Sequence, residues 1–189
     1  MPVRLLRDND TVTGAELLVP EALSCRSEVS PESVAACLSL NAEDIRTAVH
    51  MPVVASVGLP FLIAELASRE ALRRCVPNLQ GFRATLPLDG AVSLYAYTLD
   101  TNADEPHDVQ ARMFTPRMTE DPATGSATAA ATALLALHRN KTTLNLNVSQ
   151  GVDMGRASVL FAGYDASSGE AVVRVGGNCV MTLEGTFSL

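Results

Sequence analysis

The feature that most restricts the fold of this chain is a long segment without any charged side chain, from Pro122 to His138. Six of the thirteen residues from Ser126 to His138 are alanine, a strong helix former. A helix on a protein surface carries a polar face, and this segment has none. We therefore expect a helix that is buried on all sides, whose small side chains let the surrounding strands approach closely. An ordinary core helix is the alternative interpretation.

The composition is that of a soluble globular protein. The chain has 189 residues, of which 47% are hydrophobic and 19% are charged, and this apolar fraction excludes a disordered chain. The net charge of −7 argues against a nucleic-acid partner, which would favour a basic surface. No apolar run reaches the roughly 18 residues that a membrane helix needs, and residues 1–8 lack the apolar core of a signal peptide. We expect one domain or two small ones, located in the cytoplasm.

The cysteines and histidines give no sign of a metal site or of a disulfide framework. The four cysteines lie at positions 25, 37, 75 and 179 and include no C-x-x-C pair. The three histidines lie far apart in the sequence, at positions 50, 107 and 138. We interpret all four cysteines as reduced, buried thiols of a cytoplasmic protein, and we expect no metal.

The rest of the sequence mixes strand signals with a few short helices. Helices are expected at 31–38 and 70–75 and directly after Asn41, each with a capping residue at its start. Strands are expected at 3–18 (one or two strands around a turn at 8–10), 53–56, 61–66, 92–99, 109–114, 143–148, 157–164, 171–175, 179–183 and 186–189. Regular alternation of strands and helices is missing, which favours an α+β fold. We expect a mixed, barrel-like sheet wrapped around the central alanine-rich helix.

The residues in front of this helix form the candidate site. Residues 120–127 run from the end of a strand into the helix. Gly125 permits a tight backbone, and the hydroxyl of Thr124 or Ser126 can cap the first turn. The free N–H groups of that turn then form an anion site, and Asp121 lies beside it as a group for proton transfer. The alternative is that Asp121 and Ser126 only cap a buried helix.

Three common loops of nucleotide-binding proteins and hydrolases are absent from the sequence. It contains no G-x-x-x-x-G-K-[ST] phosphate-binding loop and no G-x-G-x-x-G after a strand. Ser126 does not stand in a G-x-S-x-G elbow. The sequence therefore disfavours a nucleotide-dependent enzyme and a serine hydrolase.

The segment Glu-Asp-Pro-Ala-Thr-Gly-Ser-Ala, residues 120–127, resembles the hallmark of the PhzF-like family of phenazine-biosynthesis isomerases. Further features match that family in the same order, namely a lead-in strand at 111–116, a Q-G-x-x-M-G-R segment at 150–156, Val-Gly-Gly at 175–177 and Glu-Gly at 184–185. Residues 56–60, followed by an apolar strand, also fit. The resemblance therefore covers most of the chain.

The resemblance implies a fold shared with diaminopimelate epimerase, in which each of two pseudo-symmetric halves is a barrel-like sheet around a central helix. It also implies proton transfer on a small substrate without a cofactor. For this chain it implies that Asp121 assists proton transfer or orients the substrate. Ser126 and the backbone of Ala123, Thr124 and Gly125 would bind the polar or carboxylate group of that substrate.

The sequence lacks the features that the family carries in its N-terminal half. The family's N-terminal half carries an acid–base glutamate and a Gly-His motif, and this chain contains no Gly-His dipeptide. The stretch between Phe114 and Glu120 is also shorter than usual, and Ala157 stands where a proline is common. We interpret residues 1–25 as the last strands of a missing N-terminal half and residues 26–189 as the C-terminal PhzF-like domain.

These observations lead to one main hypothesis and two alternatives. The main hypothesis is the C-terminal half of an isomerase that moves a proton on a small carboxylate and is incomplete on its own. The first alternative is a non-catalytic module that binds small anions or associates with itself. The second is a structural fragment whose strands only pair with a partner. The expected partners are a small-molecule carboxylate and either a further copy of the chain, as in a homodimer, or a separate N-terminal half, with no nucleic acid and no membrane.

Overall fold

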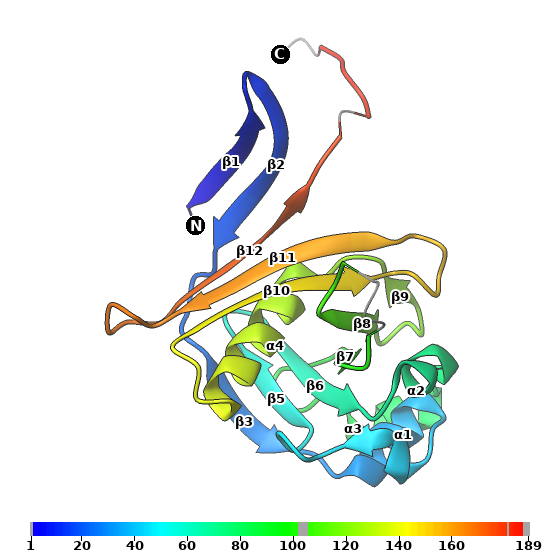
Figure 1. The fold of residues 1–189 in the computed structure, drawn as a ribbon. Helices are drawn as coiled ribbons and strands as arrows, with labels where there is room; N and C mark the ends of the chain where they lie inside the picture. Colours follow the sequence, from blue (N-terminus) through cyan, green and yellow to red (C-terminus); the bar gives the residue numbers. More distant parts are fainter. Residues whose placement is uncertain (1, 102–105, 181, 187–189) are drawn as a thin grey trace.

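The computed structural model describes residues 2–101, 106–180 and 182–186. Within these ranges one mixed sheet of twelve strands is accompanied by four α-helices (Figure 1). The strands are β1 (Val3–Asp8), β2 (Thr11–Leu18), β3 (Ser24–Glu28), β4 (Ile45–Arg46), β5 (Val53–Ser56), β6 (Pro60–Leu66), β7 (Leu94–Thr98), β8 (Val109–Phe114), β9 (Glu120–Asp121), β10 (Thr143–Gln150), β11 (Ser158–Asp165) and β12 (Val172–Asn178). The helices are α1 (Pro31–Leu38), α2 (Arg69–Arg74), α3 (Leu79–Thr85) and α4 (Gly125–His138), with a 3₁₀ turn η1 (Ala42–Asp44). The predicted α+β class is confirmed.

The order of the strands brings segments from both ends of the chain together. The sheet runs β1-β2-β12-β11-β10-β8-β7-β6-β5-β3, while β4 pairs with β6 and β9 with β8. Neighbouring strands are antiparallel except for the pairs β10–β8 and β6–β7, which are parallel. The pairing of β2 with β12 places Leu17 opposite Val175. The domain boundary that the sequence suggested at residue 25 stays a prediction.

The uncharged segment forms α4, which lies in the larger hydrophobic core. Every residue from Ala127 to Ala136 is buried. The helix contacts β5, β6, β10, β11 and β12, and Figure 1 shows it packed between these strands. Its last turn reaches solvent, since Leu137 is 55% exposed. Burial on all sides is therefore confirmed for the middle of the helix and wrong for its end.

No helix in the described ranges is long and apolar enough to cross a membrane.

Three short helices form a second core with the strands of the sheet. Its buried residues come from α1, α2 and α3 and from strands that include β6 and β7. The helix α1 begins at its predicted first residue, and α2 begins one residue before its predicted start. The hydroxyls of Ser30 and Ser68 accept hydrogen bonds from their first turns, as expected for capping residues. Two thiols, Cys37 and Cys75, are buried as expected, whereas the prediction of burial is wrong for Cys25 and Cys179, which are exposed.

The helix α3 was not predicted from the sequence. Its start is capped by Asn78, whose carboxamide oxygen accepts hydrogen bonds from the N–H groups of Gln80 and Gly81 at 3.0 Å. Gly81 disfavours a helix by its intrinsic propensity. Here it is required, because a Cβ atom at this position would lie 2.3 Å from the carbonyl oxygen of Ala36 in α1. Contact between two helices, which is not local in sequence, therefore selects the glycine.

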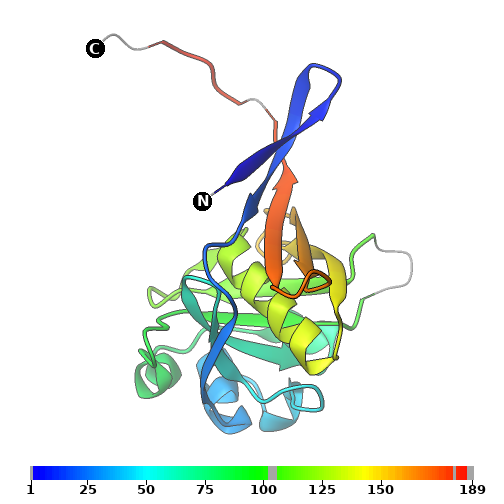
Figure 2. The same cartoon turned by 90° about the vertical axis from the view of Figure 1, so that its left-hand side faces the viewer.

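The hairpin of β1 and β2 projects away from the rest of the molecule (Figures 1 and 2). Val3 and Leu5 of β1 are 59% and 51% exposed, and β1 stands at one end of the strand order. The strand predicted at 179–183 is wrong, because its described residues belong to no strand and Val180 and Leu183 are 83% and 89% exposed. The strand predicted at 186–189 lies largely outside the described residues. The backbone N–H of Cys179 still donates to the carbonyl of Thr13 in β2 at 2.8 Å. Beyond it the segment has no neighbouring strand in the described chain, and a strand without a partner is not stable.

Candidate active site

The short strand β9 holds Asp121 in place. Met113 of β8 is the pairing partner of Asp121. The neighbouring Glu120 forms a two-point ion pair with Arg112, with Nε–Oε1 and Nη2–Oε2 distances of 3.0 and 2.7 Å. The two side chains are only 11% and 10% exposed. The remaining nitrogen of Arg112, Nη1, donates to carbonyl oxygens at the end of α2, which include that of Cys75 at 3.0 Å. These bonds fix a strand of only two residues.

Gln150, the last residue of β10, is fully buried and holds the loop between β9 and α4. Its Oε1 atom accepts a hydrogen bond from the backbone N–H of Thr124 at 3.1 Å. Its Nε2 atom donates to the backbone carbonyl of Asp121 at 2.7 Å and to Oγ1 of Thr124 at 2.9 Å. An N–H group can only donate and a carbonyl can only accept, so the two backbone groups fix the orientation of this amide.

The orientation of the amide sets the direction of the next hydrogen bond. Oγ1 of Thr124 accepts from Gln150, so its single proton points to Oδ2 of Asp121, 2.7 Å away. Oδ2 is therefore an acceptor. Oδ1 of Asp121 has no hydrogen bond within the described residues. Asp121 is half-buried, and Oδ1 is the carboxylate oxygen that Thr124 does not occupy.

The first turn of α4 begins directly after this cluster. Thr124 occupies the capping position, yet no side chain caps the turn, because the Thr124 hydroxyl bonds to Asp121 instead. The expectation that Thr124 or Ser126 caps the helix is therefore wrong. The N–H groups of a first turn have no partner within the helix and lie at the positive end of its dipole. No side-chain cap occupies them in this structure.

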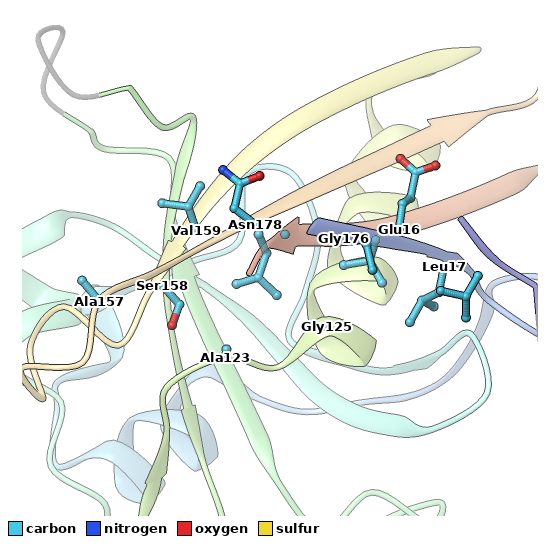
Figure 3. A pocket seen from close by; sticks show the side chains of 14 residues that line it. Glu16, Leu17, Ala123, Gly125, Ala157, Ser158, Val159, Gly176 and Asn178 are labelled. Carbon is cyan, nitrogen blue, oxygen red and sulfur yellow. The ribbon is translucent and has the colours of Figure 1, made fainter. Parts of the chain in front are cut away.

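A cavity of about 590 Å³ adjoins the start of α4 (Figure 3). Its lining includes Ala123 and Gly125, together with residues of β2, β11 and β12. A smaller, mostly apolar hollow of about 260 Å³ shares Gly125 with the cavity and is also lined by Ser126. Neither Asp121 nor Thr124 is among the lining residues of these two hollows. The five predicted site residues thus lie in one segment between β9 and the start of α4. Ala123, Gly125 and Ser126 line the hollows, while Asp121 and Thr124 bond to each other and line neither.

Two residues beside the loop were missed by the sequence analysis as parts of a site. Gln150 stood in a recognised motif, but no local pattern indicates where its side chain reaches. Glu16 of β2 is the one ionisable side chain among the described residues that line the larger cavity. It forms an ion pair with Arg4, whose Nη2 atom lies 3.0 Å from Oε1. Figure 3 shows the Glu16 carboxylate directed away from Ala123 and Gly125, so it does not belong to the loop cluster.

The turn after Gln150 packs against the same loop. Gly151 has a φ of +78°, and a Cβ atom there would lie 2.3 Å from the carbonyl oxygen of Arg156 and 2.9 Å from that of Pro122. The two backbones can approach only because residue 151 is a glycine. The Q-G pair in the sequence therefore has two separate tasks: the glutamine bonds to the loop and the glycine makes room for it.

The arrangement of the sheet, the buried helix and its N-terminal loop is that of a known class of folds. A PhzF-family phenazine biosynthesis protein of Bacillus anthracis is similar in structure, with a TM-score of 0.80 and 20% identity over 93% of this chain and 61% of that chain. A predicted epimerase of Pseudomonas aeruginosa is also similar, with a TM-score of 0.67 and 26% identity over 93% of this chain and 58% of that chain.

The sequence comparison goes further than the fold. The family model described as phenazine biosynthesis-like protein, PhzC-PhzF, matches residues 2–185. The chain belongs to this family. A curated protein of Mesorhizobium japonicum, named as an uncharacterized isomerase, is 31% identical over 176 residues, which are 88% of this chain and 57% of that protein. The chain thus spans 57% to 61% of the length of these three relatives.

Proposed function

We propose that this chain is the C-terminal half of a cofactor-independent PhzF-like isomerase, which acts by proton transfer on a small carboxylate and is incomplete on its own. The hydrogen-bond chain from Gln150 through Thr124 to Asp121 is the observation that carries this proposal. It leaves one carboxylate oxygen of Asp121 for the substrate, next to the open first turn of a buried helix. In the proposed whole protein, this lobe and a second one are pseudo-symmetric, each a barrel-like sheet around a central helix.

Each part of the loop has a separate task in this proposal. The N–H groups of the first turn and the Ser126 hydroxyl bind the carboxylate of the substrate, where the positive end of the helix dipole favours a negative charge. Oδ1 of Asp121 takes up or returns a proton, or orients the substrate for the acid–base group of the other half. The cavity of about 590 Å³ accepts the body of a small molecule.

A titration with sodium acetate tests the binding step. We expect acetate to shift the backbone amide resonances of residues 123–127, because the N–H groups of Gly125, Ser126 and Ala127 form the open turn and those of Ala123 and Thr124 lie next to it. Ser126→Ala should weaken this binding by removing one donor, whereas Ser167→Ala, in the turn between β11 and β12, should leave it unchanged. Asp121→Asn should bind acetate as well as the wild type or better, because a neighbouring negative charge is gone. If acetate moves none of these amides, the loop is only the start of a buried helix.

The exposed apolar residues of the hairpin suggest a protein partner for the same lobe. Val3 and Leu5 on the outermost strand, and Val180 and Leu183 after β12, are more than half exposed, and open strand edges pair readily with other chains. We infer that a separate N-terminal half or a second copy of the chain covers this region. When no separate N-terminal half is present, we expect sedimentation to give a species of at least twice the 19.9 kDa chain mass at micromolar concentration. A monomer under these conditions would contradict self-association, and addition of an N-terminal half would then decide between partners.

A further inference from the structure

At the end of α4 opposite to the candidate site, three buried polar side chains lie side by side. Tyr97 of β7 is fully buried, and its hydroxyl lies 2.7 Å from Nε2 of His50, which is 4% exposed. Glu65 of β6 is 1% exposed and pairs in register with Tyr97, so both side chains point to the same face of the sheet. The ring of His138, the last residue of α4, is centred 5.6 Å from that of His50. The proposed isomerase chemistry uses none of these groups.

The hydrogen bonds of His50 have a fixed direction. The carbonyl oxygen of Met51 lies 2.7 Å from Nδ1 and can only accept, so Nδ1 carries a proton. In the neutral ring Nε2 is then an acceptor, and the Tyr97 hydroxyl donates to it. The Tyr97 oxygen keeps a free lone pair on the side of the sheet that it shares with Glu65.

Glu65 lacks the partners that a buried carboxylate needs. Neither of its oxygens has a hydrogen-bond partner in the part of the chain that the structure describes. The guanidinium Nε of the half-exposed Arg46 lies 3.5 Å from Oε1. Burial raises the pKa of Glu65, and the charges of Arg46 and Arg139, together with the neighbouring Tyr97 side chain, oppose this only in part. A protonated Glu65 gains a donor, for which the Tyr97 oxygen is an acceptor.

We propose that Glu65, Tyr97 and His50 share one proton along a buried chain of hydrogen bonds at the C-terminal end of α4, which we call the lock. The lock takes up a second proton at His50 when the pH falls and loses its one proton from Glu65 when the pH rises. In one form Glu65 is protonated and donates to Tyr97, which donates to His50. In the other form Tyr97 has passed its hydroxyl proton to Nε2 of His50 and has taken up the Glu65 proton in its place. The products are a carboxylate at Glu65, an imidazolium at His50 and an unchanged tyrosine, so no co-reactant is needed.

The titratable and charged groups that act on the three residues are Arg46 of β4, Tyr95 of β7, and His138 and Arg139 at the end of α4. Burial lowers the pKa of His50, the hydrogen bond to Met51 opposes this, and the charge of His138 adds to the lowering. Burial, and then the charge of Glu65, raise the pKa of Tyr97 well above its ordinary value, so Tyr97 stays neutral and only passes protons on.

The two ends of the lock respond to pH in opposite directions. The folded-state pKa of His50 lies below its ordinary value of 6.5, so its contribution to stability is complete above pH 6.5 and is lost as the pH falls toward the folded-state value. The folded-state pKa of Glu65 lies above its ordinary value of 4.5, so its contribution is complete below pH 4.5 and is lost as the pH rises through the folded-state value. A shared proton makes each of these titrations depend on the other residue.

Nitrogen NMR of the His50 ring tests the sharing directly. In the wild type we expect the tautomer protonated at Nδ1. The variant Glu65→Gln holds no exchangeable acid proton, so the proton-binding constant of His50 should fall by about three-fold or more. In a Tyr97→Phe background the link is cut, and the same change at Glu65 should have little effect. His138→Asn is the control, because it removes a neighbouring charge and should leave the effect of Glu65→Gln in place.

Equal His50 midpoints in the wild type and in Glu65→Gln would overturn the proposal. Thermal unfolding gives a second measurement that does not depend on the NMR assignments. At pH 8 the midpoint temperature of Glu65→Gln should lie above that of the wild type by about 2–4 °C, because a buried charge is removed, and the gap should close at pH 4.5. A midpoint temperature of Glu65→Gln that falls below that of the wild type at pH 8 would show that the charge of Glu65 is stabilising, and the lock would be excluded.

Discussion

An aspartate at position 130 should leave the chain unable to fold. Ala130 is 0% exposed in the middle of α4 and belongs to the larger core. A carboxylate there loses its hydration without gaining a cation as partner, which costs several kcal/mol. Its extra atoms also overpack the contact between the helix and the strands. This cost is comparable to the whole stability of a typical domain, about 5–15 kcal/mol. We expect Ala130→Asp to yield no soluble, cooperatively unfolding protein.

The matched control for this change is Leu137→Asp on the same helix. Leu137 is 55% exposed, so the same charge remains hydrated, and the free energy of unfolding should change by only about 1 kcal/mol. Soluble yield and urea unfolding followed by circular dichroism measure both variants. If Ala130→Asp and Leu137→Asp unfold at the same urea concentration, α4 is not the centre of the core.

The burial of α4 could be predicted because a long segment without charges has few physical explanations. The same holds for the hairpin of β11 and β12, which was expected at 157–164 and 171–175 and is confirmed at Ser158–Asp165 and Val172–Asn178. In both cases the signal is local: residue types within one segment decide its environment. The α+β class follows from such signals. The pairing of β2 with β12 joins segments that are far apart in the sequence, and neither segment by itself indicates its partner.

The candidate site was predicted in its residues but not in its bonds. The sequence indicated Asp121, Thr124 and Ser126, yet the Thr124 hydroxyl bonds to Asp121 instead of capping the helix. Gln150 decides this, and it reaches the loop from a strand that follows α4 in the chain. The prediction of a strand at 179–183 failed for a related reason. A mostly apolar run permits a strand, but only a neighbouring strand can supply its hydrogen bonds.

The proton-transfer proposal predicts that Asp121→Asn removes turnover and keeps the fold. An asparagine has the same shape and can still accept the hydrogen bond of Thr124, which lies 2.7 Å from Oδ2 in the wild type. Its amide cannot take up or return a proton at the position of Oδ1. Removal of a positioned acid–base group lowers the rate by about 10²–10⁴-fold. The chain alone should show little turnover in any case, because the acid–base glutamate implied for the other half is not part of it.

The measurement is incorporation of deuterium from D₂O into small carboxylates, followed by mass spectrometry, with the N-terminal half of the Mesorhizobium japonicum relative supplied as a separate chain. Asp165→Asn at the end of β11 makes the same chemical change away from the loop and should retain the full rate, which separates loss of the proton-carrying group from general damage. Acetate binding to residues 123–127 should persist in Asp121→Asn. If this variant exchanges deuterium at the wild-type rate, Asp121 carries no proton. If acetate binds but no deuterium exchange occurs, with or without the added N-terminal half, the result would instead favour a lobe that binds small anions and performs no chemistry.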